Sequence, residues 1–384
     1  MSEQDAADRG TVKSAAGESV AGETPAGPGA ADLAAGPPAT AHRVGRRDPV
    51  PLAAVIGITV VGGLILAAMN GSYLGLTVTT GVGYAIVTVG MVLQLGYSRQ
   101  LAFSQSVFMG VGAYGTGVLE TKYGFSSLES LLAVIGLAAV AALLIGAVVT
   151  RAPGLALALA TLLLPLFIYQ LATYSSWLGS FSGIDGVLPF VTGPDYEATL
   201  VRSGIVSVLL LGLAAGLVLR VMRSGIGLQL MAMAEDERLG ASIGVSLRQR
   251  RLEVFVLGSV LAAVGGAVLA SAQGLVTPDV LSESTQITLL LMLFVAGRKS
   301  IAGAILGAIV IEYLTTSTSF ISTNIGIIEG IALLVILLVE PDGVAGAVDR
   351  FLGRRTDQWA GSLRSWSAAR LRARGGGNGA GNTA

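Results

Sequence analysis

Long apolar runs, separated by short polar segments, occupy the chain from residue 52 to residue 340. The hydrocarbon core of a bilayer is about 30 Å thick, so a transmembrane helix needs about 20 consecutive, largely apolar residues. The pattern therefore predicts about ten membrane spans. They lie near residues 52–69, 73–95, 100–119, 128–150, 154–174, 203–221, 253–272, 284–297, 301–318 and 324–340.

Two of these predicted spans are irregular. The third begins with Gln100 and contains Ser104, Gln105 and Ser106, which indicates a broken or re-entrant helix. The eighth is short, which indicates a helix that is tilted, thins the bilayer locally or lies buried within the bundle.

Polar tails flank the apolar region. Residues 1–48 are rich in Ala, Gly, Pro and acidic residues, which is typical of a disordered tail. The pattern of a cleaved signal peptide is missing there, so we expect the first span to act as an uncleaved signal anchor. Residues 350–384 form a basic tail with Trp359 and Trp366, which either lies on the anionic inner leaflet or is solvated. The transmembrane domain is assigned to residues 49–349.

Arginine and lysine are shared unequally between alternate loops, and cytoplasmic loops carry the excess. With the N-terminus inside, the outside segments hold only Lys122 and Arg202. The cytoplasmic segments hold Arg43, Arg46, Arg47, Arg99, Arg151, six arginines between Arg220 and Arg251, Arg298, Lys299 and the arginines of the C-terminal tail. We therefore expect an all-α bundle of about ten transmembrane helices, with the N- and C-termini cytoplasmic.

Composition supports this class and excludes several chemistries. The chain is 53% hydrophobic and only 12% charged, whereas a soluble domain has about 25% charged residues. It has no cysteine, and its one histidine, His42, lies in the polar tail, so thiol catalysis, a Ser-His-Asp triad and Cys- or His-based metal sites are excluded. Lys299 and Ser300 lack the glycine that precedes them in a phosphate-binding loop. We expect no catalytic residue, no metal and no cofactor in this chain. The net charge of zero gives no indication of a nucleic-acid partner.

The segment from Arg220 to Glu253 concentrates charge between two apolar spans. It holds ten of the 48 acidic and basic residues, so it must lie in water. The acidic run 235–237 is expected to begin a short helix, because carboxylates favour the positive end of the helix dipole. Leu239 and Ile243 would share one face of that helix. The pattern predicts a docking helix within the cytoplasmic loop 222–251, although an ordinary solvated loop is the alternative.

Some residues within the predicted spans are candidates for a translocation path. Gly110, Gly112, Gly115 and Gly117 allow close approach of helix backbones or leave backbone open beside a path, and close packing is favoured. Gln105 and Thr161 are polar at membrane depth, so each lines a path or bonds across helices.

Two carboxylates, Glu312 and Glu329, also fall within predicted spans. An ionisable residue at this depth is a functional hypothesis by default. A proton-coupled carrier would use such groups, but structural pairing with a neighbouring helix is favoured.

Five blocks of sequence, in colinear order over residues 52–340, resemble the LivM-like branch of the branched-chain amino acid-type ABC permeases. The block at residues 93–119, LQLGYSRQLAFSQSVFMGVGAYGTGVL, is similar to the family pattern N-L-G-Y-x-G-Q-L-S-x-G-x-A-x-F-x-G-I-G-A-Y, with Arg99 and Ser104 in place of glycines. The shared residues are Leu95, Gly96, Tyr97, Gln100, Leu101, Phe108, Gly110, Gly112, Ala113 and Tyr114.

The other blocks are shorter. GLALALATL, from Gly154, resembles G-x-Y-F-A-x-x-T-L, and SGIDGV, from Ser182, resembles an outside-loop G-x-D-G pattern. LVTPDVLS followed by LLLMLFVAGRKSIAGAILGA resembles a late block, with Gly297–Ser300 departing from its usual G-G-x-G-[ST] loop. The segment AMAEDERLGASIGV resembles the cytoplasmic "EAA" loop, with Leu239 and Gly240 at its two alanine positions.

The resemblance implies the permease subunit of an ATP-driven importer for branched-chain or related amino acids, in the bacterial inner membrane. It implies four kinds of partner: membrane lipid, a second homologous permease, two cytoplasmic ATPase subunits that bind the ATP, and an extracytoplasmic binding protein. The implied ATPase-coupling residues are Glu235, Asp236, Glu237, Leu239, Gly240, Ile243 and Gly244. The candidate translocation path comprises Gln105, Gly110, Gly112, Tyr114 and Thr161. Asp185 and Gly186 are the candidate contacts for the binding protein.

Three alternatives stay open at this point. Urea, short amides or other small organic solutes are alternative cargoes. A proton-coupled secondary transporter that uses Glu312 or Glu329 is an alternative mechanism, and a non-transporting membrane scaffold is a third class.

Overall fold

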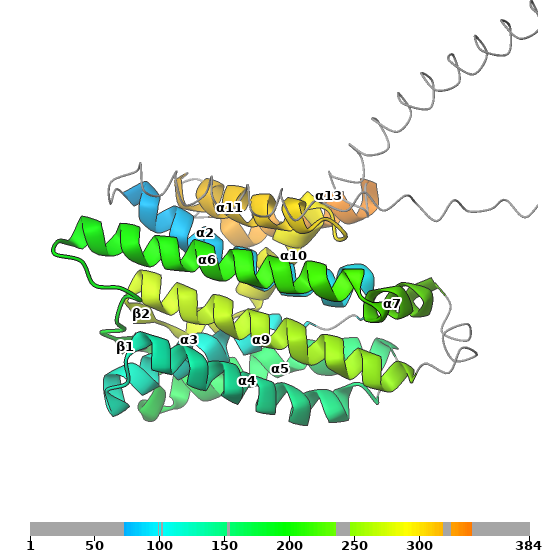
Figure 1. Cartoon of the computed structure of the whole chain (residues 1–384), viewed down its shortest axis with the longest axis horizontal. Coiled ribbons are helices and arrows are strands. Elements are labelled where there is room, and N and C mark those ends of the chain that lie inside the picture. The colour runs from blue at the N-terminus through cyan, green and yellow to red at the C-terminus, as the bar shows by residue number, and fades with distance from the viewer. Residues whose placement is uncertain are drawn as a thin grey trace, which may run out of the picture. The chain divides into compact units, whose positions relative to one another are not determined.

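The computed structural model describes residues 73–98, 100, 103–151, 154–235, 246–317 and 324–339 (Figure 1). In chain order, the helices are α2 (Tyr73–Met91), continued by the π-helical turn η1 (Val92–Tyr97), α3 (Gln105–Tyr123), α4 (Ser127–Val149), α5 (Gly154–Tyr174), the 3-10 turns η2 (Ser176–Leu178) and η3 (Ser180–Ser182), α6 (Tyr196–Arg223), α7 (Gly225–Glu235), α9 (Leu247–Gln273), the 3-10 turn η4 (Pro278–Leu281), α10 (Glu283–Ala296), α11 (Ile301–Ser317) and α13 (Ile325–Val339). Two short strands, β1 (Ile184–Asp185) and β2 (Leu275–Val276), accompany them.

The fold is an all-α polytopic bundle, as predicted, and each predicted span from 73–95 onward coincides with a helix. Among the described residues, four helical stretches are long and apolar enough to cross a membrane alone: Gly75–Tyr97, Ser127–Val149, Tyr196–Arg223 and Leu247–Gln273. Helix α5 joins the η2–η3 segment through a bend of 85°. The first predicted span, 52–69, and both predicted tails lie outside the described residues.

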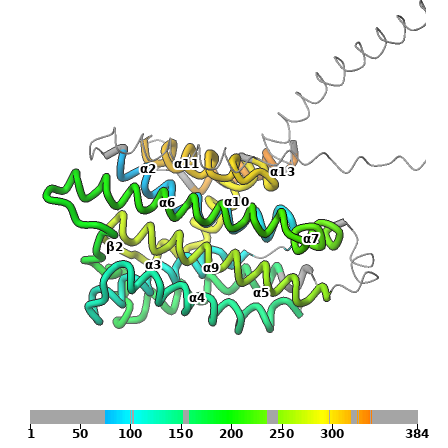
Figure 2. Tube along the Cα trace, viewed as in Figure 1, coloured from blue at the N-terminus to red at the C-terminus, as the bar shows by residue number. Residues whose placement is uncertain are grey.

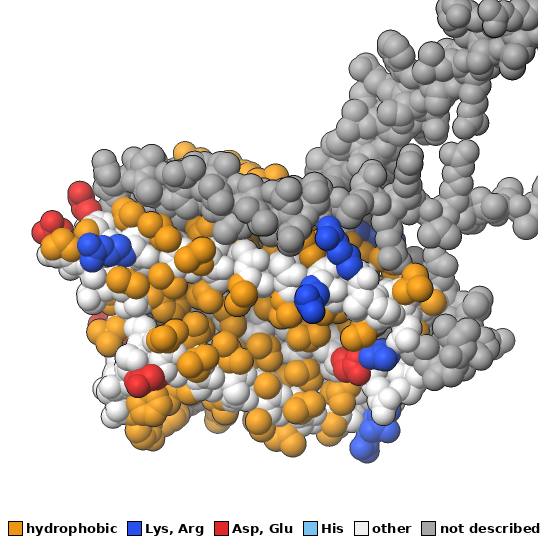
Figure 3. All heavy atoms as spheres, in the orientation of Figure 1, with side chains coloured by type: hydrophobic (Ala, Val, Ile, Leu, Met, Phe, Trp, Pro, Cys, Tyr) orange, Lys and Arg blue, Asp and Glu red, His pale blue; other side chains and the backbone are white. Residues whose placement is uncertain are grey.

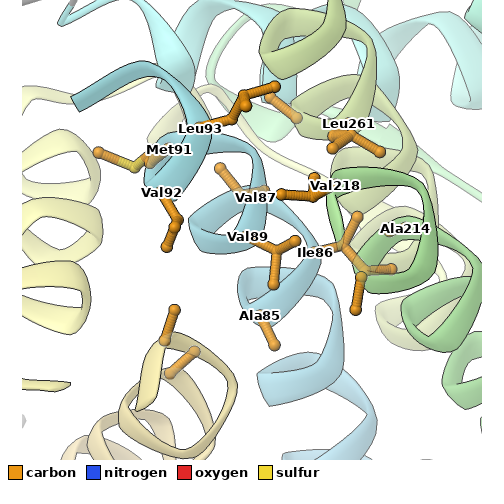
Figure 4. Packing of buried hydrophobic residues seen from close by; sticks show 14 of the residues in the cluster. Ala85, Ile86, Val87, Val89, Met91, Val92, Leu93, Ala214, Val218 and Leu261 are labelled. Atoms are coloured by element: carbon orange, nitrogen blue, oxygen red, sulfur yellow. The ribbon is translucent and has the colours of Figure 1, made fainter. Parts of the chain in front are cut away.

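Helices α2 and α9 form the centre of the bundle. In the most apolar stretch of each, 83% of the residues are buried, whereas the corresponding value for α4 is 22%. Figure 2 shows α11 and α2 on one side of α9 and α4 on the other, and α9 contacts both α2 and α4. Ile86 of α2, Ala214 of α6 and Leu261 of α9 belong to one buried hydrophobic cluster, and Figure 4 shows Ile86 beside Ala214.

Small residues allow α9 to approach α3 very closely. A Cβ on Gly112 of α3 would lie 1.9 Å from the carbonyl oxygen of Ala263 on α9. A Cβ on Gly266 of α9 would likewise lie 1.9 Å from the carbonyl oxygen of Met109. The two backbones are therefore in direct contact, which is a common way to pack helices in lipid.

The outer faces of the peripheral helices are apolar. Leu209 and Leu213 on α6 are 62% and 73% exposed, and Leu144 on α4 is 68% exposed. Figure 3 shows hydrophobic side chains across the middle of one face, with charged side chains near its two ends. This distribution is expected for helices that face lipid with their middle and water with their ends.

Two short strands that are distant in sequence pair at one end of the bundle. Strand β1 pairs antiparallel with β2, with Ile184 opposite Val276 and Asp185 opposite Leu275. The pair lies at the left end of the bundle in Figure 1, and α7 lies at the right end. It joins the segment after α5 to the segment after α9, which no alternation of apolar residues in the sequence indicated.

Two sequence-based boundaries differ from the structure. The third predicted span begins at residue 100, but α3 begins at Gln105, after a break that follows Tyr97. The acidic run was expected to begin a helix, but Glu235 is the last residue of α7. The helix expected after Glu235 falls on residues 236–245, outside the described residues.

Candidate translocation site

The break between η1 and α3 brings buried polar groups into the apolar bundle. Helix α2 continues as η1, which ends at Tyr97, and the Tyr97 hydroxyl donates to the carbonyl of Lys299 at 2.8 Å. The chain then turns, and the Gln100 N–H donates back to the carbonyl of Gln94 at 3.0 Å. Helix α3 starts at the buried Gln105, whose side chain lies against Gln94 of η1.

A chain of hydrogen bonds links the start of α3 to its neighbours. The Gln105 side-chain amide donates to the side-chain oxygen of Gln94, whose own amide donates to the carbonyl of Phe255 on α9 at 3.0 Å. The Ser106 N–H donates to the side-chain oxygen of Gln286 on α10 at 3.1 Å. Gln94, Gln105 and Ser106 are fully buried, and Gln286 is 7% exposed. Residues of η1, α3, α9 and α10 thus meet at one point.

Several polar atoms at this point have no partner among the described residues. They are the hydroxyls of Ser104 and Ser106, the side-chain oxygen of Gln105 and the side-chain amide nitrogen of Gln286. Both side-chain polar atoms of Gln100, which is 3% exposed, also have no partner among the described residues. An unsatisfied buried polar group costs about 1–3 kcal/mol, so a cluster of them calls for a reason other than stability.

The structure brings two of the predicted path residues together at the start of α3. Thr161 on α5 accepts the N–H of Phe103 at 3.0 Å and donates to the carbonyl of Ala158 at 3.1 Å. Thr161 therefore holds the chain just before α3, while Gln105 holds its first turn. The polar cluster is the set of buried polar residues Gln94, Gln100, Ser104, Gln105, Ser106 and Gln286, and Thr161 borders it through Phe103.

The other predicted path residues lie further along α3 and pack against protein. A Cβ on Gly110 would lie 2.2 Å from the Cδ2 atom of Leu281, and Gly112 faces the backbone of α9. Tyr114 is 6% exposed and belongs to an apolar cluster with Ile184 and Val187. Nine residues separate it from Gln105, which is about 13 Å along a helix. For the two glycines, the close-packing alternative is the one that the structure favours.

Comparison with known proteins places the fold in a family. The family model described as "Branched-chain amino acid transport system / permease component" matches residues 73–339, well over half of the chain. The chain belongs to this permease family. Because the family consists of permease components and the helices are apolar, the chain is a multi-pass membrane protein.

Individual relatives of the permease agree with the family match. The high-affinity branched-chain amino acid transport system permease protein LivM of Escherichia coli K12 is 26% identical over 253 residues, which cover 59% of each chain. LivM of Salmonella typhimurium LT2 is 24% identical over 252 residues, again 59% of each chain. LivH of Escherichia coli K12 is 28% identical over 127 residues, 32% of this chain and 40% of LivH. The permease thus spans about 59% of the length of the LivM relatives that it matches. No solved structure matches it significantly.

The predicted coupling residues lie almost wholly outside the described part of the permease. Asp236, Glu237, Leu239, Gly240, Ile243 and Gly244 are not described, and of Glu235 only the backbone is. The preceding helix α7 is described, and its Leu230 is fully buried. Helix α7 contacts α6, α9 and η1, so the segment that leads into the predicted coupling residues is packed onto the bundle.

The predicted contact with a binding protein lies at the opposite end of the permease. Asp185 is exposed at the end of β1, and Gly186 follows it with a φ of 84°, a conformation that favours glycine. The Gly186 N–H donates to the carbonyl of Gly274 at 3.1 Å, which fixes the turn. No protein atom lies within 4 Å of a Cβ placed on Gly186, so this turn is open on the described structure.

The two intramembrane carboxylates pair with hydroxyl groups. The Thr288 hydroxyl on α10 lies 2.7 and 2.8 Å from the two carboxylate oxygens of Glu329 on α13, which is 1% exposed. The Thr316 hydroxyl donates to Glu312 at 3.4 Å within α11. The cross-helix contact of Glu329 is the structural pairing favoured from the sequence.

Two members of the polar cluster, Gln94 and Gln286, were not among the sequence-based candidates. Each is a lone glutamine beside an apolar run, and this is the only signal that the sequence offers. Their partners, Phe255 and Ser106, lie 161 and 180 residues away along the chain. Only the folded bundle identifies them.

Proposed function

We propose that this permease is the membrane subunit of an ATP-driven ABC importer that carries branched-chain or related amino acids across the bacterial inner membrane. The family match over residues 73–339, which includes every described helix, carries the proposal. The buried polar cluster at the start of α3 supports it, because a polar solute needs hydrogen-bonding partners where lipid provides none.

The proposed complex contains several other subunits. Relatives named LivM and LivH both match the chain, which supports pairing with a second, homologous permease. Two cytoplasmic ATPases bind the ATP, and a soluble binding protein delivers the solute outside. The exposed Asp185–Gly186 turn is the proposed contact with this binding protein.

Helix α7 gives a physical route from the ATPases to the polar cluster. The predicted coupling residues follow α7 directly, and α7 contacts η1, whose Gln94 bonds to Gln105. Closure of the ATPases would displace α7 as a rigid body and shift η1 with it. Such a shift would change the polar cluster between its outward- and inward-facing forms.

Reconstitution of the complete complex in proteoliposomes tests the proposal. With the second permease, both ATPases and the binding protein present, we expect uptake of radiolabelled L-leucine that depends on ATP. Ligand identification on the binding protein would then name the natural cargo. A permease that binds no ATPase, or a complex that takes up leucine only with a proton gradient, contradicts the proposal.

The buried carboxylates are the basis for one competing function, a proton-coupled carrier. A proton-coupled carrier would need Glu329 or Glu312 to exchange a proton during transport. The hydroxyl partner of Glu329 on a neighbouring helix supports a structural role for this carboxylate instead.

A further inference from the structure

The first turns of α3 and α10 lie side by side and run in opposite directions. Leu281, just before α10, packs where a side chain on Gly110 would be, and Gln286, in the first turns of α10, bonds to Ser106. Residue 281 thus lies against residue 110 of α3, and residue 286 lies against residue 106. The two segments are therefore antiparallel. Helix α3 begins at fully buried residues and brings the positive end of its dipole into the bundle, whereas the first turn of α10 carries the exposed Glu283.

The two helix starts differ in how their N–H groups are satisfied. In α10, the N-cap Ser282 accepts the N–H of Thr285 at 3.2 Å, and Glu283 stands exposed in the first turn. In α3, the N-cap Ser104 makes no such bond although it is fully buried. Helix N-termini with free donors bind anions.

The hydrogen-bond network fixes which side-chain atoms stay unpaired. A backbone N–H can only donate, so Ser106 requires the oxygen of the Gln286 side chain and leaves its amide nitrogen over. The carbonyl of Phe255 can only accept, so it takes the amide of Gln94, and Gln105 must turn its own amide toward Gln94. The oxygen of Gln105 is then left over.

The unpaired groups are complementary to the two charged groups of an amino acid. The Ser104 and Ser106 hydroxyls and the Gln286 amide nitrogen can donate, and the Gln105 oxygen can only accept. Glu329 does not occupy this site. Its partner Thr288 is two residues from Gln286, about 200° around the helix, and so faces the other side of α10.

We infer that the start of α3 is a transient site for the zwitterionic head of an α-amino acid. The Ser104 and Ser106 hydroxyls, the Gln286 amide and the N-terminal end of α3 hold the carboxylate, and the Gln105 side-chain oxygen accepts the ammonium group. All these protein groups are neutral, so they bind a charged solute less tightly than a fixed charge of opposite sign would. A transport site requires such weak binding, because the solute must also leave. The inference rests on the proposed function and deepens it, because it favours an amino acid over a neutral amide.

The double variant Ser104→Ala/Ser106→Ala tests this site. Both hydroxyls lack a protein partner among the described residues, so their removal breaks no hydrogen bond of the described structure. A purely structural role predicts unchanged or higher thermal stability and unchanged transport. The proposed site predicts the same stability but a leucine uptake per ATP hydrolysed that falls about tenfold or more, because hydrogen bonds to a charged group are lost.

The experiment uses the complete reconstituted complex with radiolabelled L-leucine, with ATP hydrolysis and thermal unfolding measured in parallel. The matched control is Ser130→Ala on α4, another fully buried hydroxyl without a partner in the described part of the chain, and its uptake should equal that of the wild type. Wild-type uptake by the double variant overturns the inference and leaves the proposed function intact. An ATP-independent or absent leucine uptake by the wild-type complex overturns the proposed function itself.

Discussion

At the scale of single residues, contact between backbones limits what the central helices tolerate. Gly112 of α3 lies against the carbonyl of Ala263, where a methyl group would be only 1.9 Å from the oxygen. Gly216 of α6 is also helical, but nothing lies within 4 Å of the position of its Cβ. A side chain is therefore excluded at Gly112 but has room at Gly216.

We predict that Gly112→Ala destabilises the bundle by about 2 kcal/mol or more, because overpacking forces the backbones of α3 and α9 apart. Gly216→Ala should be neutral or slightly stabilising, because alanine restricts the unfolded chain more than glycine does. Thermal unfolding of the two purified variants in detergent checks this. Equal stability of both would contradict the close packing of α3 on α9.

The carboxylate of Glu329 separates the proposed importer from a proton-coupled carrier. Glu329→Gln keeps an oxygen that accepts from Thr288 but cannot exchange a proton. We predict that ATP-driven leucine uptake by this variant stays within about twofold of the wild type, since the hydrogen bond from Thr288 is kept. Uptake that vanishes while ATP hydrolysis and stability persist would favour proton coupling.

At the scale of elements, α7 leads from the bundle into the predicted coupling residues. Leu230 anchors α7 in the core, and α7 contacts both η1 and α9. The predicted coupling residues begin at the last residue of this packed helix. This placement suits a surface that transmits the movement of the proposed ATPase subunits to the bundle.

We predict that the triple change Glu235→Lys, Asp236→Lys and Glu237→Lys, or Gly244→Val alone, uncouples ATP hydrolysis from uptake while membrane insertion stays normal. The first reverses the charge of the proposed docking surface, and the second places a β-branched residue at Gly244, where glycine is expected to end the short helix by adopting a left-handed conformation. Leucine taken up per ATP hydrolysed is the measurement.

The control for these variants is Glu253→Gln, which lies near the start of α9. Glu253 is bonded to Arg250 at 2.6 Å in an exposed pair, and such pairs contribute about 1 kcal/mol or less. Its coupling should equal that of the wild type. Normal coupling in the charge-reversed and Gly244→Val variants as well would argue against a docking role for residues 235–244.

At the scale of the whole molecule, the charges predict which end faces the cytoplasm. The described structure places Glu197 at the start of α6 and Gln249 at the start of α9, both exposed. The natural chain has no cysteine, so a single introduced thiol reports on its own position.

We predict that Glu197→Cys reacts with a membrane-impermeant maleimide in intact spheroplasts, whereas Gln249→Cys reacts only after the membrane is permeabilised. The reason is the excess of arginine in the loop that contains Gln249, which the positive-inside rule assigns to the cytoplasm. The reverse labelling pattern would invert the orientation and place the predicted coupling loop outside.

The sequence by itself determined the class of fold and the approximate position of the described helices other than α7. A membrane span must be apolar over about 20 consecutive residues, so a local stretch of sequence is enough to identify it. It also indicated that the third span is irregular, since Ser104, Gln105 and Ser106 interrupt the apolar run. For the same local reason it marked Gln105 and Thr161 as polar groups that need partners.

Only the tertiary structure decided where those partners lie. Gln286 reaches Ser106 across 180 residues of chain, and Gln94 reaches Phe255 across 161, distances over which no local pattern specifies a pair. The structure also showed that Gly110 and Gly112 face protein and that the start of α3 keeps unpaired donors inside the bundle. Hydrogen-bond satisfaction depends on which helices pack together, so the fold alone could turn a scattered set of polar residues into one candidate site.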